Sequence, residues 1–596
     1  MGRIFSRITT KYIYLMKNDT ALKYPFLFIF ALLFFTQWAF SQGEPFSAKL
    51  VLNQTPANAG DRYYLMHPFA MVYGPDDSLW ISERRGRVMK VNSNDGKRRI
   101  ILDIRNFVKF TTSGGSIRQN GMMGLALHPN YPAVDSFFVA YAYNFAGGTR
   151  CRIVRYQVKN NTINNPAGNE TIIIQGLPAG DDHSTGRLIT GPDNKLYYAV
   201  GDLGANQFAN RCSPIRSQDV PTPAELSAQN YMAYQGKILR INLDGSIPAD
   251  NPTIKGIKSH IYSFGHRNPV GLTFAKDGNQ QNYIGAKLYE AENGPATDDE
   301  VNEIIAGKNY GWPYWSGLPD DKIYQYKNWS SASNCNASPA PGSEPECATP
   351  PATAVVMNET DTVLPNAQVP IRTFFTPASA SIACTWLQNP TVAPSAIAYY
   401  GYDSKIPGWQ NSLLMTTLKE GTLFRLKLNA AGSSFVTLSN GSDTARYFRE
   451  ENRYRDIALG SDGLTFYLLT DSTGRTSGPT SGNTNILLNR GSILVYKYTG
   501  TTLSLGEPPA TSLNIKKLVR LYPNPATTYL NTEVKSNTAK PVYYFIYDVA
   551  GRLILKEKSF RDVTTIEVSA LKAGTYIIKL YDGHMLNIGV QKFIVQ

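Results

Sequence analysis

Histidine, cysteine and charged side chains are scarce in this chain of 596 residues, which has six histidines, five cysteines and 18% charged residues. None of the cysteines has the paired short spacing of a zinc site. No Gly-x-Gly-x-x-Gly motif follows a candidate strand, so a Rossmann site for a nicotinamide or flavin is unsupported. The hydrophobic content of 42% is that of an ordinary globular protein, which argues against disorder for most of the chain.

The N-terminal apolar run is too short for a membrane span. Its ten residues, 26–35, fall short of the roughly 20 that cross a bilayer. Basic residues precede the run and Ala39-Phe-Ser41 follows it, which is the order of a signal peptide cleaved before Gln42. We therefore expect residues 1–41 to be a Sec-type export signal, with a membrane anchor as the alternative.

The formal net charge of +13 is unevenly distributed. Residues 1–41 carry +4 and residues 516–596 carry +6, which leaves +3 for the rest of the chain. That central part is nearly neutral, and it has no basic run interleaved with aromatic residues as in a nucleic-acid-binding surface. We expect no nucleic-acid partner.

All five cysteines lie in the part of the chain that would be exported, where disulfides are stable. They are Cys151, Cys212, Cys335, Cys347 and Cys384. Two bridges among them can be drawn in fifteen ways, with one thiol left over. Because Cys335 and Cys347 share a Ser/Pro/Ala-rich insertion at residues 330–354, we favour a bridge that closes this small loop.

Three similar segments each combine a Gly-x-Asp turn with a run of aromatic, aliphatic and β-branched residues. They are residues 74–82, 191–199 and 460–468. Recurrence of this turn-strand unit, with little helical periodicity, predicts an all-β chain and favours a β-propeller over a sandwich. We interpret the three segments themselves as scaffold.

Near Thr499 the composition changes to Thr, Ser, Pro and Gly, which predicts a linker at residues 499–517. Beyond it come Leu521-Tyr-Pro-Asn-Pro-Ala526, Tyr547-Asp-Val-Ala-Gly-Arg552 and Leu571-Lys-Ala-Gly-Thr-Tyr-Ile-Ile578. This set resembles the C-terminal sorting domain of the type IX secretion system. The resemblance implies that residues 518–596 form a small β-sandwich. Through the type IX secretion machinery it would direct the protein from the periplasm to release or surface anchoring. A carbohydrate-binding or other sandwich module is the alternative.

A second resemblance rests on three widely separated segments. They are Ala179-Gly-Asp-Asp-His-Ser-Thr-Gly-Arg187, Ser259-His-Ile-Tyr-Ser-Phe-Gly-His-Arg-Asn-Pro269 and Glu451-Asn-Arg-Tyr-Arg-Asp456. Together they resemble the soluble glucose/sorbosone dehydrogenases, quinoproteins that use pyrroloquinoline quinone (PQQ) and calcium. The resemblance runs from about residue 52 to residue 498. It implies a six-bladed β-propeller over residues 42–498.

Oxidation of a sugar hydroxyl requires a base for the O–H proton and a positive group for charge that develops on the hydride acceptor. The resemblance makes His183 the base, with Asp202 as the partner that fixes its tautomer. It places Arg267, whose guanidinium is always charged and planar, against the reacting quinone oxygen. These three residues are the predicted catalytic set.

Four further residues match positions that hold the cofactor in that family. Asn268 accompanies Arg267 at the quinone, and Lys419, Arg453 and Arg455 match a cationic clamp for the three PQQ carboxylates. Arginines two apart on a strand point the same way, which suits one shared anion. A solvated strand face is the alternative interpretation of the two arginines.

The segment Glu290-Ala-Glu-Asn-Gly-Pro295, followed by Asp298-Asp-Glu-Val-Asn302, resembles the calcium segment of the family, where the carbonyls of Gly294 and Pro295 would hold the ion. Asn293 stands where the family often has glutamine. A second, structural calcium is implied by a further set of residues: Glu300, Tyr310 and Asp320. In family members that site lies by a dimer interface, so the same resemblance implies a homodimer.

Substrate recognition departs furthest from the family pattern. Gln119 and Asp182 match sugar-contacting positions, and Phe208 matches a position in the pocket wall. The aromatic wall expected just before Pro390 is altered, because Trp386 is displaced and packing in the core is its alternative role. The preferred aldose therefore stays open.

These observations predict an exported quinoprotein that oxidises the C1 hydroxyl of glucose-like aldoses to the lactone. A hydride would pass to calcium-bound PQQ, and electrons would leave to an external quinone or cytochrome. One alternative is a calcium-dependent propeller lactonase, which would not need the cationic clamp. The other is a non-catalytic propeller that binds sugar or protein, against which the combination of His183 and the clamp argues.

Overall fold

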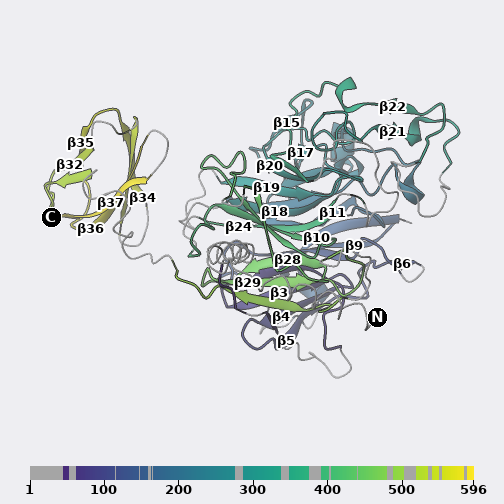
Figure 1. Cartoon of the computed structure of the whole chain (residues 1–596), viewed down its shortest axis with the longest axis horizontal. Coiled ribbons are helices and arrows are strands. Elements are labelled where there is room, and N and C mark those ends of the chain that lie inside the picture. Colours follow the sequence, from purple (N-terminus) through teal and green to yellow (C-terminus); the bar gives the residue numbers. More distant parts are fainter. Residues whose placement is uncertain are drawn as a thin grey trace, which may run out of the picture. The chain divides into compact units, whose positions relative to one another are not determined.

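The structure is a computed structural model, and two compact units, Met1–Leu503 and Ser504–Gln596, make up the chain (Figure 1). It describes residues 44–47, 49–52, 62–113, 116–146, 148–158, 163, 166–184, 186–275, 286–336, 348–374, 389, 391–401, 405–438, 441–478, 487–502, 519–534, 538, 540–548, 553–582 and 587–596. The expected signal peptide lies outside these residues, as does all but the start of the expected linker. Within them, no helix has the length and apolar character needed to cross a membrane.

Within the described residues, the first unit contains six antiparallel four-stranded sheets. The first three are formed by β2 (Pro68–Tyr73), β3 (Ser78–Glu83), β4 (Arg87–Asn92) and β5 (Arg98–Asp103); by β8 (Met122–Leu127), β9 (Ser136–Phe145), β10 (Gly148–Gln157) and β11 (Glu170–Pro178); and by β12 (Leu188–Thr190), β13 (Leu196–Val200), β14 (Lys237–Ile241) and β17 (Ile261–Phe264). The next three are formed by β18 (Pro269–Ala275), β19 (Lys287–Glu292), β20 (Asp299–Ile304) and β23 (Arg372–Phe374); by β24 (Pro394–Tyr400), β25 (Ser412–Thr417), β26 (Leu423–Lys427) and β27 (Thr444–Tyr447); and by β28 (Tyr454–Leu459), β29 (Thr465–Thr470), β30 (Ile493–Lys497) and β1 (Leu50–Val51).

Small elements decorate this framework. They are the hairpins β6 (Thr112–Ser113) with β7 (Ser116–Ile117), β15 (Thr253–Ile254) with β16 (Ile257–Lys258) and β21 (Tyr326–Asn328) with β22 (Val355–Met357), the helix α3 (Pro223–Ser227), and the 3-10 turns η1 (Pro166–Gly168), η2 (Phe208–Asn210), η3 (Met232–Tyr234), η4 (Trp329–Ser331) and η6 (Glu359–Asp361). The described part of the chain is therefore nearly all β, which confirms the predicted all-β class.

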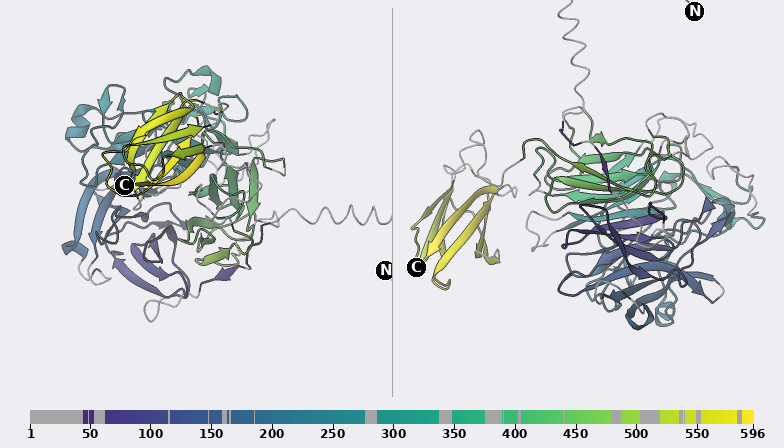
Figure 2. Two further views of the ribbon diagram at one scale, coloured as in Figure 1. Left: turned by 90° about the vertical axis from the view of Figure 1, so that its left-hand side faces the viewer. Right: turned by 90° about the horizontal axis from the view of Figure 1, so that it is seen from below.

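The first strands of the sheets contact one another in a closed cycle: β2, β8, β12, β18, β24, β28 and back to β2 (Figure 2). β1 pairs antiparallel with β30 at the edge of the last sheet, with Leu50 opposite Val495. The two ends of the unit thus complete one sheet, so the cycle cannot open there without breaking that pairing.

Apolar side chains fill the space between neighbouring sheets. Trp80 and Phe137 pack between the first two sheets with ring centroids 5.4 Å apart. Trp409 and Phe466 do the same between the fifth and sixth, also at 5.4 Å. Each aromatic side chain buries about 150–250 Å². The hydrophobic effect therefore holds the sheets face to face around the cycle.

The predicted Gly-x-Asp turns each feed the second strand of a sheet. Gly74 N–H donates to Ser78 C=O at 2.8 Å before β3, and Gly191 N–H donates to Lys195 C=O at 2.8 Å before β13. Gly460 N–H donates to the carbonyl of residue 465 in the same way before β29. Their assignment as scaffold turns agrees with the structure.

The second unit has two sheets, β31 (Val519–Tyr522), β32 (Tyr529–Val534) and β35 (Val563–Glu567), and β34 (Leu553–Ser559), β33 (Val542–Asp548), β36 (Gly574–Tyr581) and β37 (Asn587–Val595). Burial alternates along β33 and β36, as expected for strands with one face inward. Tyr544, Ile566 and Phe593 come from different strands and are fully buried in one shared core.

Candidate active site

The residues predicted for the site gather at one edge of the inner strands. In each sheet the first two strands are antiparallel, so the start of the first lies beside the end of the second. Pro269 of β18 pairs with Glu292 of β19, and Pro394 of β24 pairs with Thr417 of β25. Loops that precede first strands and loops that follow second strands therefore meet at this edge.

A pocket of about 240 Å³ opens there. Eight of the residues predicted from the sequence line it: Gln119, Asp182, His183, Phe208, Arg267, Asn268, Gly294 and Pro295. Six others line it as well: Gln207, Asn293, Asp299, Asn389, Thr391 and Ala393. The phenyl ring of Phe208 is on the rim, with 40% of the residue exposed. Trp386 lies outside the described residues.

His183 is held by Asp202. Its Nδ1 lies 2.7 Å from Asp202 Oδ1, and Asp202 Oδ2 accepts the Trp312 indole N–H at 2.9 Å. His183 and Asp202 are both buried. A carboxylate at Nδ1 makes that nitrogen the protonated one, so Nε2 carries the lone pair. The backbone of His183 has φ 39°, a conformation that is unfavourable away from glycine and recurs at functional sites.

The side-chain amide of Gln207 lies between His183 and Arg267 and contacts both. Its amide nitrogen donates to Asp182 Oδ2 at 2.9 Å and lies 3.2 Å from His183 Nε2. Its amide oxygen accepts from Arg267 Nη2 at 2.9 Å. An amide oriented in this way has its NH₂ group toward two acceptors, which agrees with an unprotonated Nε2 on His183.

Arg267 lies beside the carbonyl groups of the calcium segment. Its Nη1 donates to Asn293 C=O at 3.0 Å and to Gly294 C=O at 2.8 Å. The guanidinium carbon is 5.4 Å from the centre of the Trp312 ring. Its Nε has no hydrogen-bond partner among the described residues. A buried cation with a spare donor therefore faces backbone oxygens in the pocket wall.

Asp299 links that segment to the loop that precedes β24. Its Oδ1 accepts Gly294 N–H at 3.0 Å, and its Oδ2 accepts the N–H groups of Val392 and Ala393 at 2.6 and 2.8 Å. Burial raises the pKa of Asp299 to about 6, against the effect of these N–H donors and of Lys419, which lower it. Its charge adds negative potential beside the carbonyls, which favours a cation there.

Lys419 lies behind the part of the pocket wall that Asn389 and Thr391 form. Its ammonium donates to the Asn389 carbonyl and to Thr391 Oγ1, the latter at 3.0 Å. Both partners line the pocket. Lys419 thus brings a buried positive charge close to the cavity.

The side chains of Arg453 and Arg455 point toward the same anion, as the sequence predicted, and that anion is the carboxylate of Asp471 in this structure. Arg455 Nη2 lies 2.6 Å from Asp471 Oδ2, and Arg453 Nε lies 3.5 Å from it. The guanidinium of Arg84 interacts with this group as well. Burial, and then the charge of Arg455, lower the pKa of Arg84 to about 10. Two guanidinium groups pair with this one carboxylate and a third lies in its field, and Arg455 Nε has no hydrogen-bond partner in the described part of the chain. This arginine cluster has positive charge to spare for a further anion.

Arg84 connects the arginine cluster to the pocket. Its guanidinium donates to the carbonyls of Arg118 and Asn120, the latter at 3.0 Å. Gln119 lies between those two residues and lines the pocket. The arginine cluster and the loop of Gln119 are therefore neighbours.

The residues predicted for a second calcium are only partly brought together. Glu300 Oε1 accepts Gly317 N–H at 2.7 Å, on the loop that continues to Asp320. Glu359, which the sequence did not single out, accepts Ser316 N–H at 2.9 Å on the same loop. Burial raises the pKa of Glu300 and of Glu359 to about 8, with further contributions from neighbouring carboxylates.

The side chain of Tyr310 turns away from this loop. Its hydroxyl donates to Glu303 C=O at 2.6 Å, and its ring stacks on His266 at 4.7 Å. Asp320 forms an ion pair with Lys322 at 2.6 Å. The structure thus places Glu300, Asp320 and Glu359 around one acidic loop, without the tyrosine side chain.

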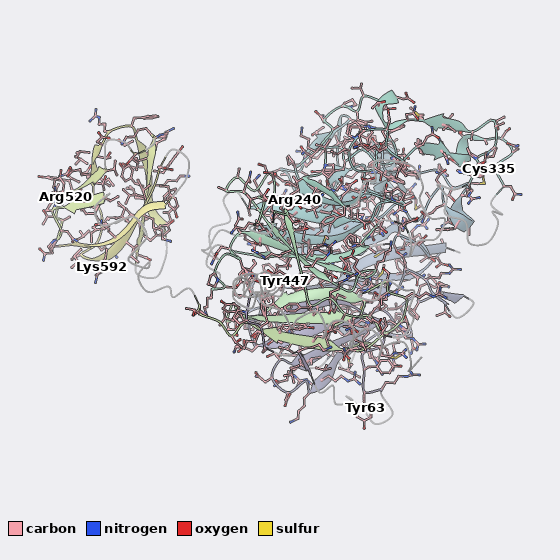
Figure 3. The ribbon with its side chains drawn as sticks, viewed as in Figure 1. Tyr63, Arg240, Cys335, Tyr447, Arg520 and Lys592 are labelled. Atoms are coloured by element: carbon pink, nitrogen blue, oxygen red, sulfur yellow. A yellow bond between two sulfur atoms is a disulfide. The ribbon has the colours of Figure 1, made fainter. Side chains whose placement is uncertain are left out.

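The predicted bridge between Cys335 and Cys347 is wrong. Cys335 is bonded to Cys212, 123 residues away, with Cα atoms 5.8 Å apart (Figure 3). The physical reason is that the segment leading into the insertion packs against the loop of Asn206, whose amide donates to Lys327 C=O at 2.8 Å and accepts Trp329 N–H at 2.9 Å. Cys347 lies outside the described residues. Cys151 is a buried free thiol.

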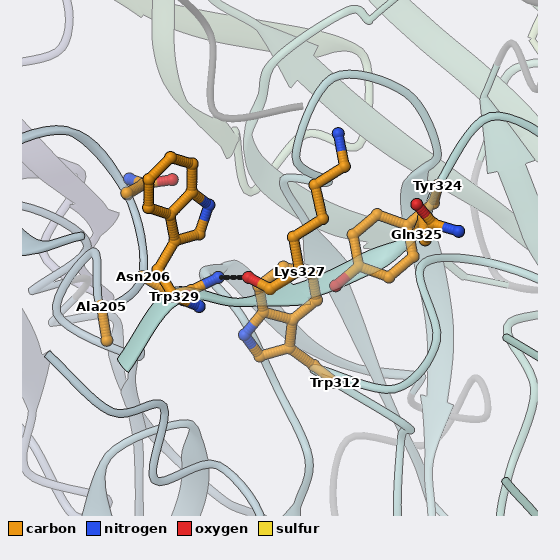
Figure 4. Close-up of a pocket in the computed structure, with 8 residues that line it drawn as sticks. Ala205, Asn206, Trp312, Tyr324, Gln325, Lys327 and Trp329 are labelled. Atoms are coloured by element: carbon orange, nitrogen blue, oxygen red, sulfur yellow. Dashed lines mark hydrogen bonds between the residues drawn. The ribbon is translucent and has the colours of Figure 1, made fainter. Parts of the chain in front are cut away.

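The same contact encloses a small aromatic cavity of about 30 Å³ (Figure 4). Its lining consists of Ala205, Asn206, Gln207, Trp312, Tyr324, Gln325, Lys327 and Trp329. A volume of this size is about that of one water molecule in the liquid. The cavity is therefore too small to admit a sugar ring.

Oxidation of an alcohol with an anionic cofactor needs a base, a cation beside it and a separate positive site for the cofactor. The pocket and the arginine cluster together contain groups of these kinds. The chain belongs to the glucose/sorbosone dehydrogenase family, whose model matches residues 65–346 and 370–478. Residues 520–596 match a secretion system C-terminal sorting domain. Both resemblances drawn from the sequence are confirmed.

Two named bacterial relatives match most of the first unit, and a third relative matches a shorter part of it. Quinoprotein glucose dehydrogenase B of Acinetobacter calcoaceticus is 35% identical over 482 residues, which is 78% of this chain and 93% of the relative. Aldose sugar dehydrogenase YliI of Escherichia coli K12 is 24% identical and covers 69% of this chain and 89% of its own length. Human hedgehog-interacting protein is 26% identical over 41% of this chain and 36% of its own length. The PQQ-bound aldose sugar dehydrogenase of Streptomyces coelicolor aligns in structure with a TM-score of 0.47 at 22% identity, over 76% of this chain and 98% of that one.

Several residues of the site were not found from the sequence. They are Arg84, Gln207, Asp299, Trp312 and Glu359. Asp299 had a local signal, because it lies in the second part of the calcium segment, residues 298–302, although no role was assigned to it there. The others lie in loops whose composition is ordinary, and their roles come from contacts to residues far away in the chain.

Proposed function

We propose that this protein is an exported, PQQ-dependent aldose dehydrogenase with a six-bladed propeller at residues 42–498. The observation that carries the proposal is the pocket in which His183, oriented by Asp202, lies one amide group away from Arg267. Family membership and the name of the 35% identical relative support it. The oxidised group would be the C1 hydroxyl of a glucose-like sugar, and the product its lactone.

The residues present fit the cofactor and its calcium. The arginine cluster has an excess of positive charge, and buried donors on Arg267 and Arg455 lack partners within the described residues, which suits an anionic quinone. Lys419, Arg453, Arg455 and Asn268 would hold PQQ. The carbonyls of Gly294 and Pro295 would ligate calcium. When bound, PQQ with calcium supplies the acceptor for the hydride.

Side chains of the protein would accept the proton of the substrate hydroxyl and stabilise the negative charge that develops in the reaction. His183 Nε2 accepts the proton of the substrate hydroxyl, because Asp202 keeps the other ring nitrogen protonated and stabilises the imidazolium that results. Arg267 would stabilise the negative charge that develops on the hydride acceptor. Asp182, Gln119 and Gln207 offer hydrogen bonds that orient the sugar, and Phe208 covers an apolar face of it.

The remaining features of the chain fit export. Residues 1–41 would be the signal peptide and residues 499–517 the linker. Residues 518–596 would be a β-sandwich read by the type IX machinery, followed by release or anchoring at the surface. We also propose that the acidic loop near Glu300 and Asp320 binds a structural calcium with backbone carbonyls, including that of Tyr310, and that the protein forms a homodimer. An external quinone or cytochrome would accept the electrons.

The test is dye-linked oxidation of a panel of aldoses by the purified chain, with and without PQQ and calcium. The proposal expects dye reduction that needs PQQ and that is lost in His183→Ala. Tight PQQ binding without turnover of any aldose would contradict the substrate assignment. No PQQ binding at all would contradict the quinoprotein assignment and favour a binding propeller, while PQQ-independent lactone hydrolysis would favour the lactonase.

A further inference from the structure

A buried group of metal-binding side chains lies next to the candidate active site. It consists of His266, Glu290 and Glu292, each at most 4% exposed. One ligand atom of each residue lies within 4.8 Å of those of the other two. Glu292 also accepts the backbone N–H groups of Arg267 and Asn268, the latter at 3.0 Å. The cluster therefore supports the segment that carries the pocket's guanidinium.

Glu290 is not satisfied by the protein. It is fully buried, and its Oε1 has no hydrogen-bond partner among the described residues. Its Oε2 accepts from Asn302 Nδ2 at 3.0 Å, and Asn302 Oδ1 is likewise without a partner in the described part of the chain. A buried carboxylate that leaves one oxygen unpaired carries a large desolvation cost. A ligand at this oxygen would remove that cost.

The nearest basic groups are engaged elsewhere. Lys237 donates to the carbonyls of Arg216, Ser217 and Gln235 at 2.7–3.0 Å. The guanidinium of Arg267 donates to Asn293, Gly294 and Gln207, so only its backbone N–H reaches Glu292. Within the described residues, His266 is the sole ion-pair partner of Glu292, and Glu290 has none. The negative charge of the cluster calls for a cation or a proton.

The donor set selects the kind of cation. Calcium and magnesium prefer oxygen ligands alone, whereas an imidazole with carboxylates suits a divalent transition metal. His266 Nδ1 and Glu292 Oε2 are 3.0 Å apart and share a hydrogen bond, whose proton the metal ion would replace. Two ligands about 2.1 Å from one ion and about 90° apart are separated by about 3.0 Å, so this spacing fits an octahedral ion such as Mn²⁺.

We propose that His266, Glu290 and Glu292 bind one divalent transition-metal ion, of the Mn²⁺ or Zn²⁺ kind, distinct from both calcium sites. The ion neutralises the two carboxylates and fixes Glu292, and through it the backbone of Arg267 and Asn268. The site does not depend on the proposed function. Burial raises the pKa of Glu290 well above its ordinary value, so a proton on Glu290 is the rival occupant.

The experiment measures bound metal by elemental mass spectrometry on the full chain, purified with calcium from cells grown with Mn²⁺ and Zn²⁺. Three variants are compared with the wild type. Glu290→Gln removes the unpaired charge without a change of shape, and His266→Gln removes the imidazole. Glu303→Gln is the matched control, because Glu303 lies on β20, pairs with Lys287 at 2.5 Å and is outside the cluster.

The expected result is one transition-metal ion per chain in the wild type and in Glu303→Gln, and at least a tenfold loss in both cluster variants, with calcium unchanged. A wild type without transition metal overturns the proposal and leaves the proton as the occupant, whether or not the variants fold. A wild-type metal content in either folded cluster variant also overturns it. Protein grown with Co²⁺ gives an independent readout, since ligation by an imidazole and carboxylates produces visible absorption bands that Glu290→Gln should lack.

Discussion

Arg187 and Asp456 form a buried ion pair at 2.7 Å although they are 269 residues apart in the sequence. Arg187 precedes β12, and its guanidinium also donates to the carbonyls of Val270 in β18 and Ser395 in β24, each at 2.9 Å. Asp456 belongs to β28 and accepts the N–H of Met71 in β2 at 2.7 Å. This one pair therefore ties together the inner strands of five sheets.

Replacing Arg187 with methionine should lower the free energy of unfolding by about 3–5 kcal/mol, because it leaves the Asp456 carboxylate buried without its cation. Chemical denaturation followed by fluorescence measures the change. Arg446→Met is the control, since Arg446 forms a more exposed pair with Glu420 at 3.4 Å and should cost less than about 1 kcal/mol. Equal losses in the two variants would count against a structural role for the Arg187–Asp456 pair.

Asp202→Asn should reduce turnover by about 10²–10⁴-fold while PQQ affinity stays close to that of the wild type. The neutral amide no longer imposes the Nδ1-protonated tautomer of His183 and no longer stabilises its imidazolium. Steady-state kinetics with a dye acceptor and calorimetry with PQQ separate the two effects. Asp250→Asn, at a surface partner of Arg240, is the control. Full turnover in Asp202→Asn would show that His183 needs no carboxylate.

Arg455→Met should weaken PQQ binding by about 10–100-fold, since a hydrogen bond to a charged group contributes about 1.5–3 kcal/mol. Titration calorimetry at two salt concentrations measures the affinity. Arg105→Met, which removes an exposed partner of Asp103, should leave it unchanged. If Arg455→Met bound PQQ as tightly as the wild type, the arginine cluster would not be the site of the cofactor carboxylates.

A digest of the unreduced protein should contain a peptide that joins Cys212 to Cys335. Cys335→Ser should lower the free energy of unfolding by about 2–4 kcal/mol, because the bridge restricts a long loop of the unfolded chain. Mass spectrometry identifies the peptide and denaturation measures the stability. Detection of a Cys335–Cys347 peptide instead would restore the pairing favoured from the sequence.

His67 should make the protein lose stability as the pH falls from 6.5 to 4. Burial, assisted by the nearby charge of Arg84, lowers the pKa of folded His67 to about 4, whereas the unfolded residue titrates near 6.5. Between pH 6.5 and 4 the unfolded state therefore binds a proton at His67 that the folded state does not bind, so a fall in pH favours unfolding. His67→Asn suits the local φ of 56° and should flatten this part of the curve. Unfolding midpoints between pH 4 and 7 give the test, and an unchanged slope would contradict it.

The strand-forming segments and the site motifs could be identified from the sequence because they depend on local patterns. A Gly-x-Asp turn and the run after it determine a hairpin wherever it lies, and the motif around His183 is short and specific. The same holds for the motif around Arg267. Family membership followed from site motifs such as these, and the sorting domain followed from a separate set of short motifs at residues 521–526, 547–552 and 571–578.

Contacts between distant segments were decided by the tertiary structure alone. Gln207 became the link between His183 and Arg267 because pairing of β12 with β13 puts the loop before β12 beside the loop after β13, and β18, which follows Arg267, contacts β12. Nothing in the sequence around Gln207 indicates this. The partner of Cys335 was missed for the same reason, since proximity in sequence favoured Cys347 while packing of the insertion selected Cys212. Local sequence thus determined the strands and the chemical groups. The closed arrangement of sheets determined which groups meet, because burial of apolar surface between sheets fixes the loops at their edge.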